Sequence, residues 1–414
     1  MFTVSPSNTE GSSGDTHCGT APAGHSMFKS ARRGERRRAA RGGGASAQLA
    51  DLLASLGLSR PFIMTDRYLV DSGKAAELTA PLHAAEISHG LFSETVPEPT
   101  VVSIDAALAA LKAGDHDCVI GFGGGSPIDS AKAVALLAVH GGAVRDYKAP
   151  HVQDRPGLPI IAIPTTAGTG SEATRFTIIT DDERDEKMLC AGLAYLPTAA
   201  LIDYRLTLTM PPRLTADTGI DALTHAIEAY VSRKATPVSD LWALSAMRLL
   251  APNLRRVWAD PSDEAAREAM MVGSMQAGIA FSNASVALVH GMSRPIGAHF
   301  HVPHGLSNAM LLPVVTAYSL PAAPARYADC ARAMGIAADN EGDQGAGGRL
   351  VAELEALNAE LNVPSPAAFG IAPEKWNALL PVMAQQALDS GSPGNNPIVP
   401  TPAEIQQLYR QAWA

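Results

Sequence analysis

Short apolar segments alternate with helical periodicity through the first half of the chain. A strand is expected within each of four segments, at residues 61–66, 117–125, 158–172 and 199–203. Helices are expected over residues 106–114 and 127–142, and the second has Pro in its first turn and Gly at its end. Strands separated by helices predict a parallel sheet with helices on both faces.

The pattern changes after MPPRL (residues 210–214), where strand signals stop and Ala, Leu and Met recur at helical spacing. A length of 414 residues also exceeds one ordinary core and favours two domains. We therefore predict an α/β domain over residues 45–209 and an all-helical domain over residues 210–414.

The first 44 residues differ from the rest, being rich in Ser, Gly and Thr and then in Arg. We expect residues 1–44 to form a disordered basic arm without the apolar core of a secretory signal. A net charge of −9, few aromatics and no membrane-length apolar run disfavour nucleic-acid and membrane partners. Four isolated cysteines indicate a reduced, cytoplasmic protein.

Four side chains in the second half form a candidate metal site. Asp221 and His225 are four residues apart in an apolar-periodic stretch, so a helix would present both from one face. His290 and His304 bracket the segment HGMSRPIGAHFHVPH. One carboxylate with three imidazoles suits Fe²⁺ or Zn²⁺ better than Mg²⁺ or Ca²⁺. The alternative for any one of these histidines is an ordinary buried core residue.

Two glycine-containing loops follow predicted strands. GFGGGSPIDSAK enters a helix, where backbone N–H groups and the helix dipole favour a pyrophosphate. In PTTAGTGSE, Thr165, Thr166 and Thr169 are candidates to hold a phosphate or the nicotinamide amide. Asp66 ends the first strand, where a carboxylate accepts from a ribose and favours NAD over NADP. The alternatives are ordinary turns for both loops and a helix cap for Asp66.

Taken together and in order, GGGSPIDSAK, PTTAGTGSE, DALTHAIEAY and HGM-x₃-PIGA-x₅-PHG resemble the iron-containing (group III) alcohol dehydrogenases. The resemblance covers about residue 45 to the C-terminus. It implies a dinucleotide-binding α/β domain, an all-α domain of dehydroquinate synthase-like architecture, and a homodimer. The implied metal ligands are Asp221, His225, His290 and His304. The implied cofactor-binding residues are Asp66, Gly124, Gly125, Ser126, Asp129, Thr165, Thr166, Thr169, Thr174, Phe176, Lys187 and Leu206.

Three features depart from this family pattern. Arg294 stands where many members carry a histidine associated with proton relay, and an arginine is a poor general base. It is instead suited to anchor an anionic group of the substrate or the cofactor, while His299 and His301 are alternative proton carriers. Glu98 replaces a usual Asn. The strands expected before GASAQL are missing, with an Arg-rich stretch in their place.

The resulting functional prediction is NAD-linked hydride transfer to and from a small alcohol, diol or aldehyde, with a divalent metal polarising its oxygen. We keep two alternatives with anionic substrates, a dehydroquinate-synthase-like lyase and a maleylacetate-type reductase. The ligand set admits both Fe²⁺ and Zn²⁺.

Overall fold

The computed structural model describes residues 25–29, 36–184 and 186–414. The chain divides into two compact units. The first contains the residues up to Thr165 together with Arg175–Leu206, and the second contains Thr166–Thr174 and Thr207–Ala414. Residues 166–174 therefore belong with the helical unit, although the sequence pattern predicts them within the α/β domain.

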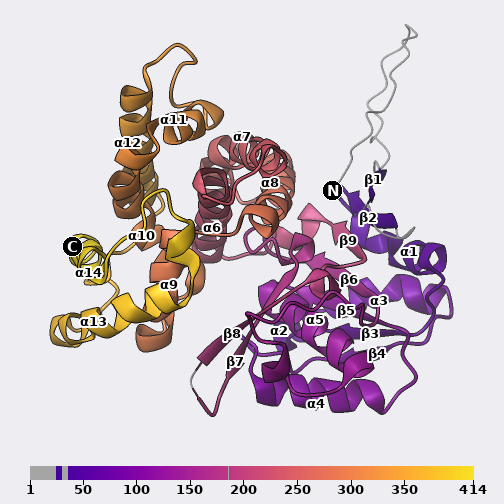
Figure 1. Ribbon diagram of the computed structural model, residues 1–414. Coiled ribbons are helices and arrows are strands. Elements are labelled where there is room, and N and C mark those ends of the chain that lie inside the picture. The colour runs from indigo at the N-terminus through magenta and orange to yellow at the C-terminus, as the bar shows by residue number, and fades with distance from the viewer. Residues whose placement is uncertain (1–24, 30–35, 185) are drawn as a thin grey trace, which may run out of the picture. The chain divides into compact units, whose positions relative to one another are not determined.

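The first unit is built on a seven-stranded sheet in the order β1-β2-β9-β6-β5-β3-β4 (Figure 1). Six strands run parallel and only β1 is antiparallel to its neighbour, which confirms the predicted parallel sheet. The strand bounds are β1 His25–Lys29, β2 Arg36–Arg41, β3 Pro61–Met64, β4 Gly90–Phe92, β5 Cys118–Gly123, β6 Ile160–Pro164 and β9 Ala199–Ile202.

Helices cover both faces of this sheet because its central strands are apolar on both sides. One face packs on α4 (Val101–Lys112) and α5 (Gly125–His140), and the other on α1 (Leu49–Leu56), α2 (Arg67–Asp71) and α3 (Lys74–Ala84). Helix α5 lies close to β5, since a Cβ on Gly121 would come 2.7 Å from Cα of Ile128. This contact holds the start of α5 against the end of β5.

Two sequence expectations about strands are corrected. Residues 36–41 form β2, which pairs in parallel with β9. The expectations that strands are missing here and that the whole arm is disordered are therefore wrong for these residues. Ala39 and Ala40 are buried and pair with Ala200 and Leu201. Two small apolar side chains are therefore enough to form a strand here, without a long apolar run. The rest of the 1–44 arm, residues 1–24 and 30–35, lies outside the described residues.

The second correction is an antiparallel hairpin, β7 (Phe176–Asp181) and β8 (Glu186–Ala191), which forms a sheet of its own. The sequence analysis missed it because its charged residues hide an alternation: in β7, Thr177, Ile179 and Asp181 are buried, while their neighbours are less so. That alternation of period two was the available signal.

The second unit contains nine α-helices among the described residues, which confirms the predicted all-helical half. They are α6 Pro212–Val231, α7 Pro237–Ala259, α8 Glu264–Ala284, α9 Leu288–Phe300, α10 His304–Ser319, α11 Pro324–Ala333, α12 Asp343–Glu360, α13 Pro373–Asp389 and α14 Pro402–Gln411. Sixteen of the twenty α6 residues are buried, so α6 is a central helix of its unit.

No single described helix is both long and apolar enough to cross a bilayer; α8 and α9, bent by 103° at their break, meet that test only when joined.

Asp203, which directly follows β9, fixes the start of the first helical segment to the sheet. Its buried carboxylate accepts from the backbone N–H groups of Gly44 (3.0 Å) and Ser46 (3.1 Å) and from the Ser46 hydroxyl (2.5 Å). We expect Asp203→Ala to lower the free energy of unfolding by about 3 kcal/mol, because several donors lose a charged acceptor. Urea unfolding measures this. The exposed Asp105→Ala is the control, and an equal loss in both variants would contradict the assignment.

Candidate functional site

Helix α6 carries two of the four predicted metal ligands. Asp221 and His225 lie one turn apart on the same face of α6, and both are almost fully buried. The Asp221 Oδ1 and His225 Nε2 atoms are 3.8 Å apart. The predicted geometry, a carboxylate and an imidazole presented from one helical face, is therefore present.

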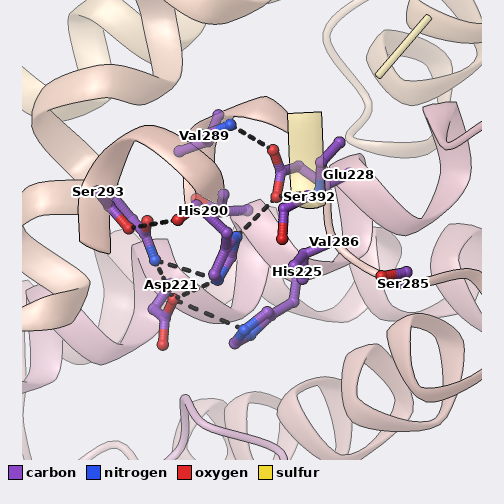
Figure 2. A network of polar contacts seen from close by, with 12 residues as sticks. Asp221, His225, Glu228, Ser285, Val286, Val289, His290, Ser293 and Ser392 are labelled. Atoms are coloured by element: carbon purple, nitrogen blue, oxygen red, sulfur yellow. Dashed lines mark hydrogen bonds and ion pairs between the residues drawn. The ribbon is translucent and has the colours of Figure 1, made fainter. Parts of the chain in front are cut away.

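Helices α9 and α10 bring the other two imidazoles to the same carboxylate. Asp221 Oδ1 lies 3.5 Å from Nε2 of His290 and 3.8 Å from Nε2 of His304 (Figure 2 shows Asp221 with His225 and His290). One candidate ligand atom from each of Asp221, His290 and His304 lies within 4.8 Å of the others. His225 joins them through Asp221 and stacks its ring on His290, with centroids 4.5 Å apart.

The electrostatics of the cluster favour positive charge. Burial alone would raise the pKa of Asp221, but the imidazoles of His225, His304 and His290 hold it well below its usual range. Burial lowers the pKa of His225 to about 4 despite the attraction of Asp221, so His225 is neutral near pH 7. For His290, hydrogen bonds with Asp221 and Glu228 outweigh burial and raise the pKa to about 9. The cluster thus holds an extra proton where a cation would fit.

Glu228 is a functional candidate that the sequence analysis missed. Its Oε2 accepts from His290 Nδ1 at 2.7 Å and from the backbone N–H of Ala287 at 2.9 Å, and its Oε1 accepts from Val289 N–H at 2.6 Å (Figure 2). The carboxylate therefore fixes the His290 ring and caps the N-terminus of α9. The available signal was a glutamate three residues after His225 in an apolar stretch, which lies near the His225 face of a helix.

Asn308, one turn after His304 on α10, is a second missed residue. Its fully buried Nδ2 lies 2.7 Å from Asp221 Oδ1 and 3.2 Å from Nε2 of both His290 and His304. An amide has only two protons, so it cannot serve three acceptors at once. The lone pairs of these oxygen and nitrogen acceptors lie close together, which is a further sign that the site suits a cation.

Asp221, His290 and His304 lie close enough together to share a borderline divalent metal ion, and His225 reaches this group through Asp221. Ligands of a tetrahedral ion at ~2.1 Å lie roughly 3.4 Å apart, and the distances from Asp221 to the imidazoles are 3.5 to 3.8 Å. Small inward movements of the side chains would complete such a site. His304 is the solvent-accessible member, with 44% of its side chain exposed, whereas the side chains of the other three are at most 6% exposed.

Three further candidates from the sequence lie on α9 or just after it. Arg294 is one turn beyond His290 and is half-buried. His299 bonds through Nε2 to Gln386 of α13 at 2.8 Å, and the exposed His301 ends α9 with a φ of 55°. His299 is thus engaged in an inter-helix contact, which is the structural alternative to proton transfer.

The predicted nucleotide residues of the first unit follow neighbouring parallel strands. Asp66 follows β3, Gly124, Gly125 and Ser126 follow β5, and Thr165 follows β6, so all lie at the carboxyl edge where open α/β sheets bind ligands. Gly124 is the N-cap of α5, which leaves the first N–H groups of that helix available. Asp66 caps α2 by accepting from Leu69 N–H, as the alternative reading proposed.

Contacts that stabilise the structure near this edge involve Asp129, Phe176, Lys187 and Leu206. Asp129 accepts from Ile178 N–H, and the fully buried Lys132 donates to the Phe176 carbonyl, so both tie α5 to β7. Lys187 pairs with Glu98 at 2.6 Å. The departure at Glu98 therefore gives Lys187 a carboxylate partner. Leu206 packs on the sheet core.

The remaining predicted loop residues, Thr166, Thr169 and Thr174, lie in the second unit. Gly170 comes so close to α8 that a Cβ there would lie 2.6 Å from Cα of Gly278. Thr169 Oγ1 accepts from Ser171 N–H, and Thr174 Oγ1 donates to the Ser171 carbonyl. Thr166 Oγ1 is buried without a hydrogen-bond partner among the described residues, and it is a polar atom that a ligand would satisfy.

Comparison with known families and proteins agrees with this geometry. Residues 37–204 match the family described as iron-containing alcohol dehydrogenase, and residues 215–413 match the C-terminal part of the Fe-containing alcohol dehydrogenase family. Long-chain-alcohol dehydrogenase 1 of Geobacillus thermodenitrificans is 40% identical over 377 residues, which cover 90% of this chain and 94% of that protein.

Two solved structures are similar over nearly their full length. A 1,3-propanediol oxidoreductase has a TM-score of 0.85 and 34% identity, covering 90% of this chain and 96% of that one. A sulfoacetaldehyde reductase from Bifidobacterium kashiwanohense, in complex with NAD⁺, has a TM-score of 0.81 and 27% identity, covering 91% and 96%.

The contacts of Glu228 predict that it controls metal affinity through His290. We expect Glu228→Gln to weaken divalent metal binding by about 10- to 100-fold, because an amide cannot accept from all three donors. Competition with a chromophoric chelator, using Co²⁺ as the probe, measures this. Glu355→Gln, an exposed substitution on α12, is the control. Equal affinity in wild type and Glu228→Gln would contradict the role.

The raised pKa of His290 predicts that metal binding depends on pH. Below about pH 9 His290 holds a proton that an incoming ion must displace. Affinity for Zn²⁺ should therefore rise about tenfold for each pH unit between pH 7 and 8.5, with one proton released per ion. Calorimetry in buffers of different ionisation enthalpy counts that proton. A flat affinity over this range would show that His290 is already neutral.

Proposed function

Since the chain belongs to the iron-containing alcohol dehydrogenase family, we propose that it transfers hydride reversibly between NAD(H) and a small alcohol or diol, using one divalent metal ion. That the chain is an oxidoreductase of alcohols or aldehydes follows from its relatives. The observation that carries the finer proposal is the convergence of three imidazoles on Asp221 Oδ1.

Asp221, His225, His290 and His304 would hold the metal ion. A divalent ion with these ligands acts as a Lewis acid that polarises the oxygen of an alcohol or carbonyl. The exposed His304 marks the side on which a substrate oxygen can approach, because the other three ligands are buried. Glu228 and Asn308 keep the imidazoles and the carboxylate oriented before substrate arrives.

The carboxyl edge of the sheet would hold the dinucleotide, which supplies the hydride acceptor. Gly124 and the following N–H groups at the start of α5 suit a pyrophosphate. The NAD⁺ complex of the similar sulfoacetaldehyde reductase supports NAD for this chain. A single carboxylate, Asp66, follows β3, which favours NAD over NADP.

Fe²⁺ and Zn²⁺ both suit the proposed ligands, and the family description favours iron. A cytoplasmic homodimer remains our expectation from the sequence. The dehydroquinate-synthase-like and maleylacetate-type alternatives gain no specific support, since both matched families are of alcohol dehydrogenases.

The proposal predicts NADH formation from short alcohols only when the metal site is intact. Metal-loaded protein with NAD⁺ and a panel of short alcohols and diols should raise absorbance at 340 nm. His290→Ala should lose bound metal and lower kcat/KM by at least about 100-fold. His151→Ala, an exposed substitution in the first unit, should change neither. Full activity of His290→Ala, or no turnover by wild type with any alcohol, would refute the proposal.

A further inference from the structure

Arg294 occupies an unusual position beside the candidate metal site. It lies one helical turn after His290, so both residues lie on the same face of α9. Arg294 is half-buried, whereas all the remaining residues of α9 from Leu288 to Gly297 are buried. The Arg294 side chain is therefore largely withdrawn from water, although the residue is not fully enclosed.

Arg294 also has no hydrogen-bonding partner. Among the described residues it makes no hydrogen bond or ion pair. Every other buried or half-buried arginine of the second unit bonds to a carboxylate or a carbonyl, namely Arg213, Arg255, Arg267, Arg326 and Arg332. A partly desolvated charge without a hydrogen-bonding partner costs stability, and a bound anion would recover that cost.

The negative charge of Glu228 attracts Arg294, but the Glu228 carboxylate already accepts other hydrogen bonds. Both of its oxygens accept from His290 or from the backbone of α9. Burial lowers the pKa of Arg294, yet a guanidinium stays charged in a protein. The cation is therefore permanent, and no hydrogen bond or ion pair among the described residues neutralises it.

The distance between His290 and Arg294 on α9 limits the size of the molecule that carries the anionic group. Residues one turn apart on a helix have Cβ atoms roughly 6 Å apart. A molecule that places an alcohol oxygen near the His290 ligand atom and an anionic group at Arg294 therefore needs only a few carbons. The planar guanidinium matches a carboxylate or sulfonate in a bidentate way. A similar structure is a reductase of sulfoacetaldehyde, a short anionic aldehyde.

We propose that Arg294 is a specificity-determining residue that binds the carboxylate or sulfonate end of a short ω-hydroxy acid or its aldehyde. This rests on the proposed alcohol dehydrogenase function and narrows its substrate class to anionic alcohols and aldehydes. Arg294 binds the non-reacting end of the substrate, while the metal site holds the end that reacts.

The test compares ω-hydroxycarboxylates of three to five carbons with their uncharged amides, as substrates of the metal-loaded enzyme with NAD⁺. Wild type should prefer the carboxylate in kcat/KM by at least about tenfold at the best chain length. Arg294→Met should abolish the preference and leave the amide rate within about threefold. Arg294→Lys should retain part of it. Arg410→Met, an exposed substitution on α14, is the control for loss of one positive charge.

The thermal midpoint separates recognition from a structural role. Arg294→Met should not lower it, because no hydrogen bond or ion pair is lost. A carboxylate-to-amide ratio of kcat/KM near one in wild type would overturn the proposal, and so would a ratio that Arg294→Met leaves unchanged. In either case alcohol oxidation itself stands. A raised KM for NAD⁺ with an unchanged substrate ratio would also overturn it, by assigning Arg294 to the cofactor's phosphates.

If no alcohol is oxidised, the proposed function fails and binding decides the role of Arg294. Calorimetry of the Zn²⁺-loaded protein with the same carboxylates and amides then applies. Tighter carboxylate binding that Arg294→Met removes would support anion recognition. Equal binding of both would refute it.

Discussion

The buried carboxylate of Asp221 is the constraint on which the helical unit depends. A charge in this environment must be compensated, and Asp221 meets three imidazoles and the Asn308 amide from helices α6, α9 and α10. Without a metal ion, a proton on His290 supplies the missing positive charge. Three helices are therefore held around one anion, and the same anion makes the site selective for a cation.

Glu228 extends this arrangement outward. Its carboxylate accepts from the far side of the His290 ring and from the first N–H groups of α9. The same carboxylate thus orients a proposed metal ligand and caps the start of a helix. Arg294 follows one turn later on α9, and among the described residues it forms no hydrogen bond or ion pair. In the proposed enzyme, a single helix would carry a ligand for the reacting end of a substrate and a cation for the opposite end.

Sequence reasoning recovered what depends on local pattern: the β3, β5, β6 and β9 strands, the α5 start and the helical second half. It also selected the residues that converge on Asp221. It missed β2, which rests on two buried alanines in an Arg-rich stretch, and the β7–β8 hairpin, whose charges mask its alternation. Glu228 and Asn308 were missed because their roles depend on contacts between helices far apart in sequence, which periodicity cannot reveal.

The measurement closest to the central claim is anomalous X-ray diffraction from crystals of the metal-loaded protein, collected on both sides of the absorption edge of the bound metal. The account predicts one anomalous peak about 2 Å from a carboxylate oxygen of Asp221 and from one nitrogen each of His225, His290 and His304. A peak elsewhere, or none at this cluster in protein that chemical analysis shows to contain metal, would contradict it.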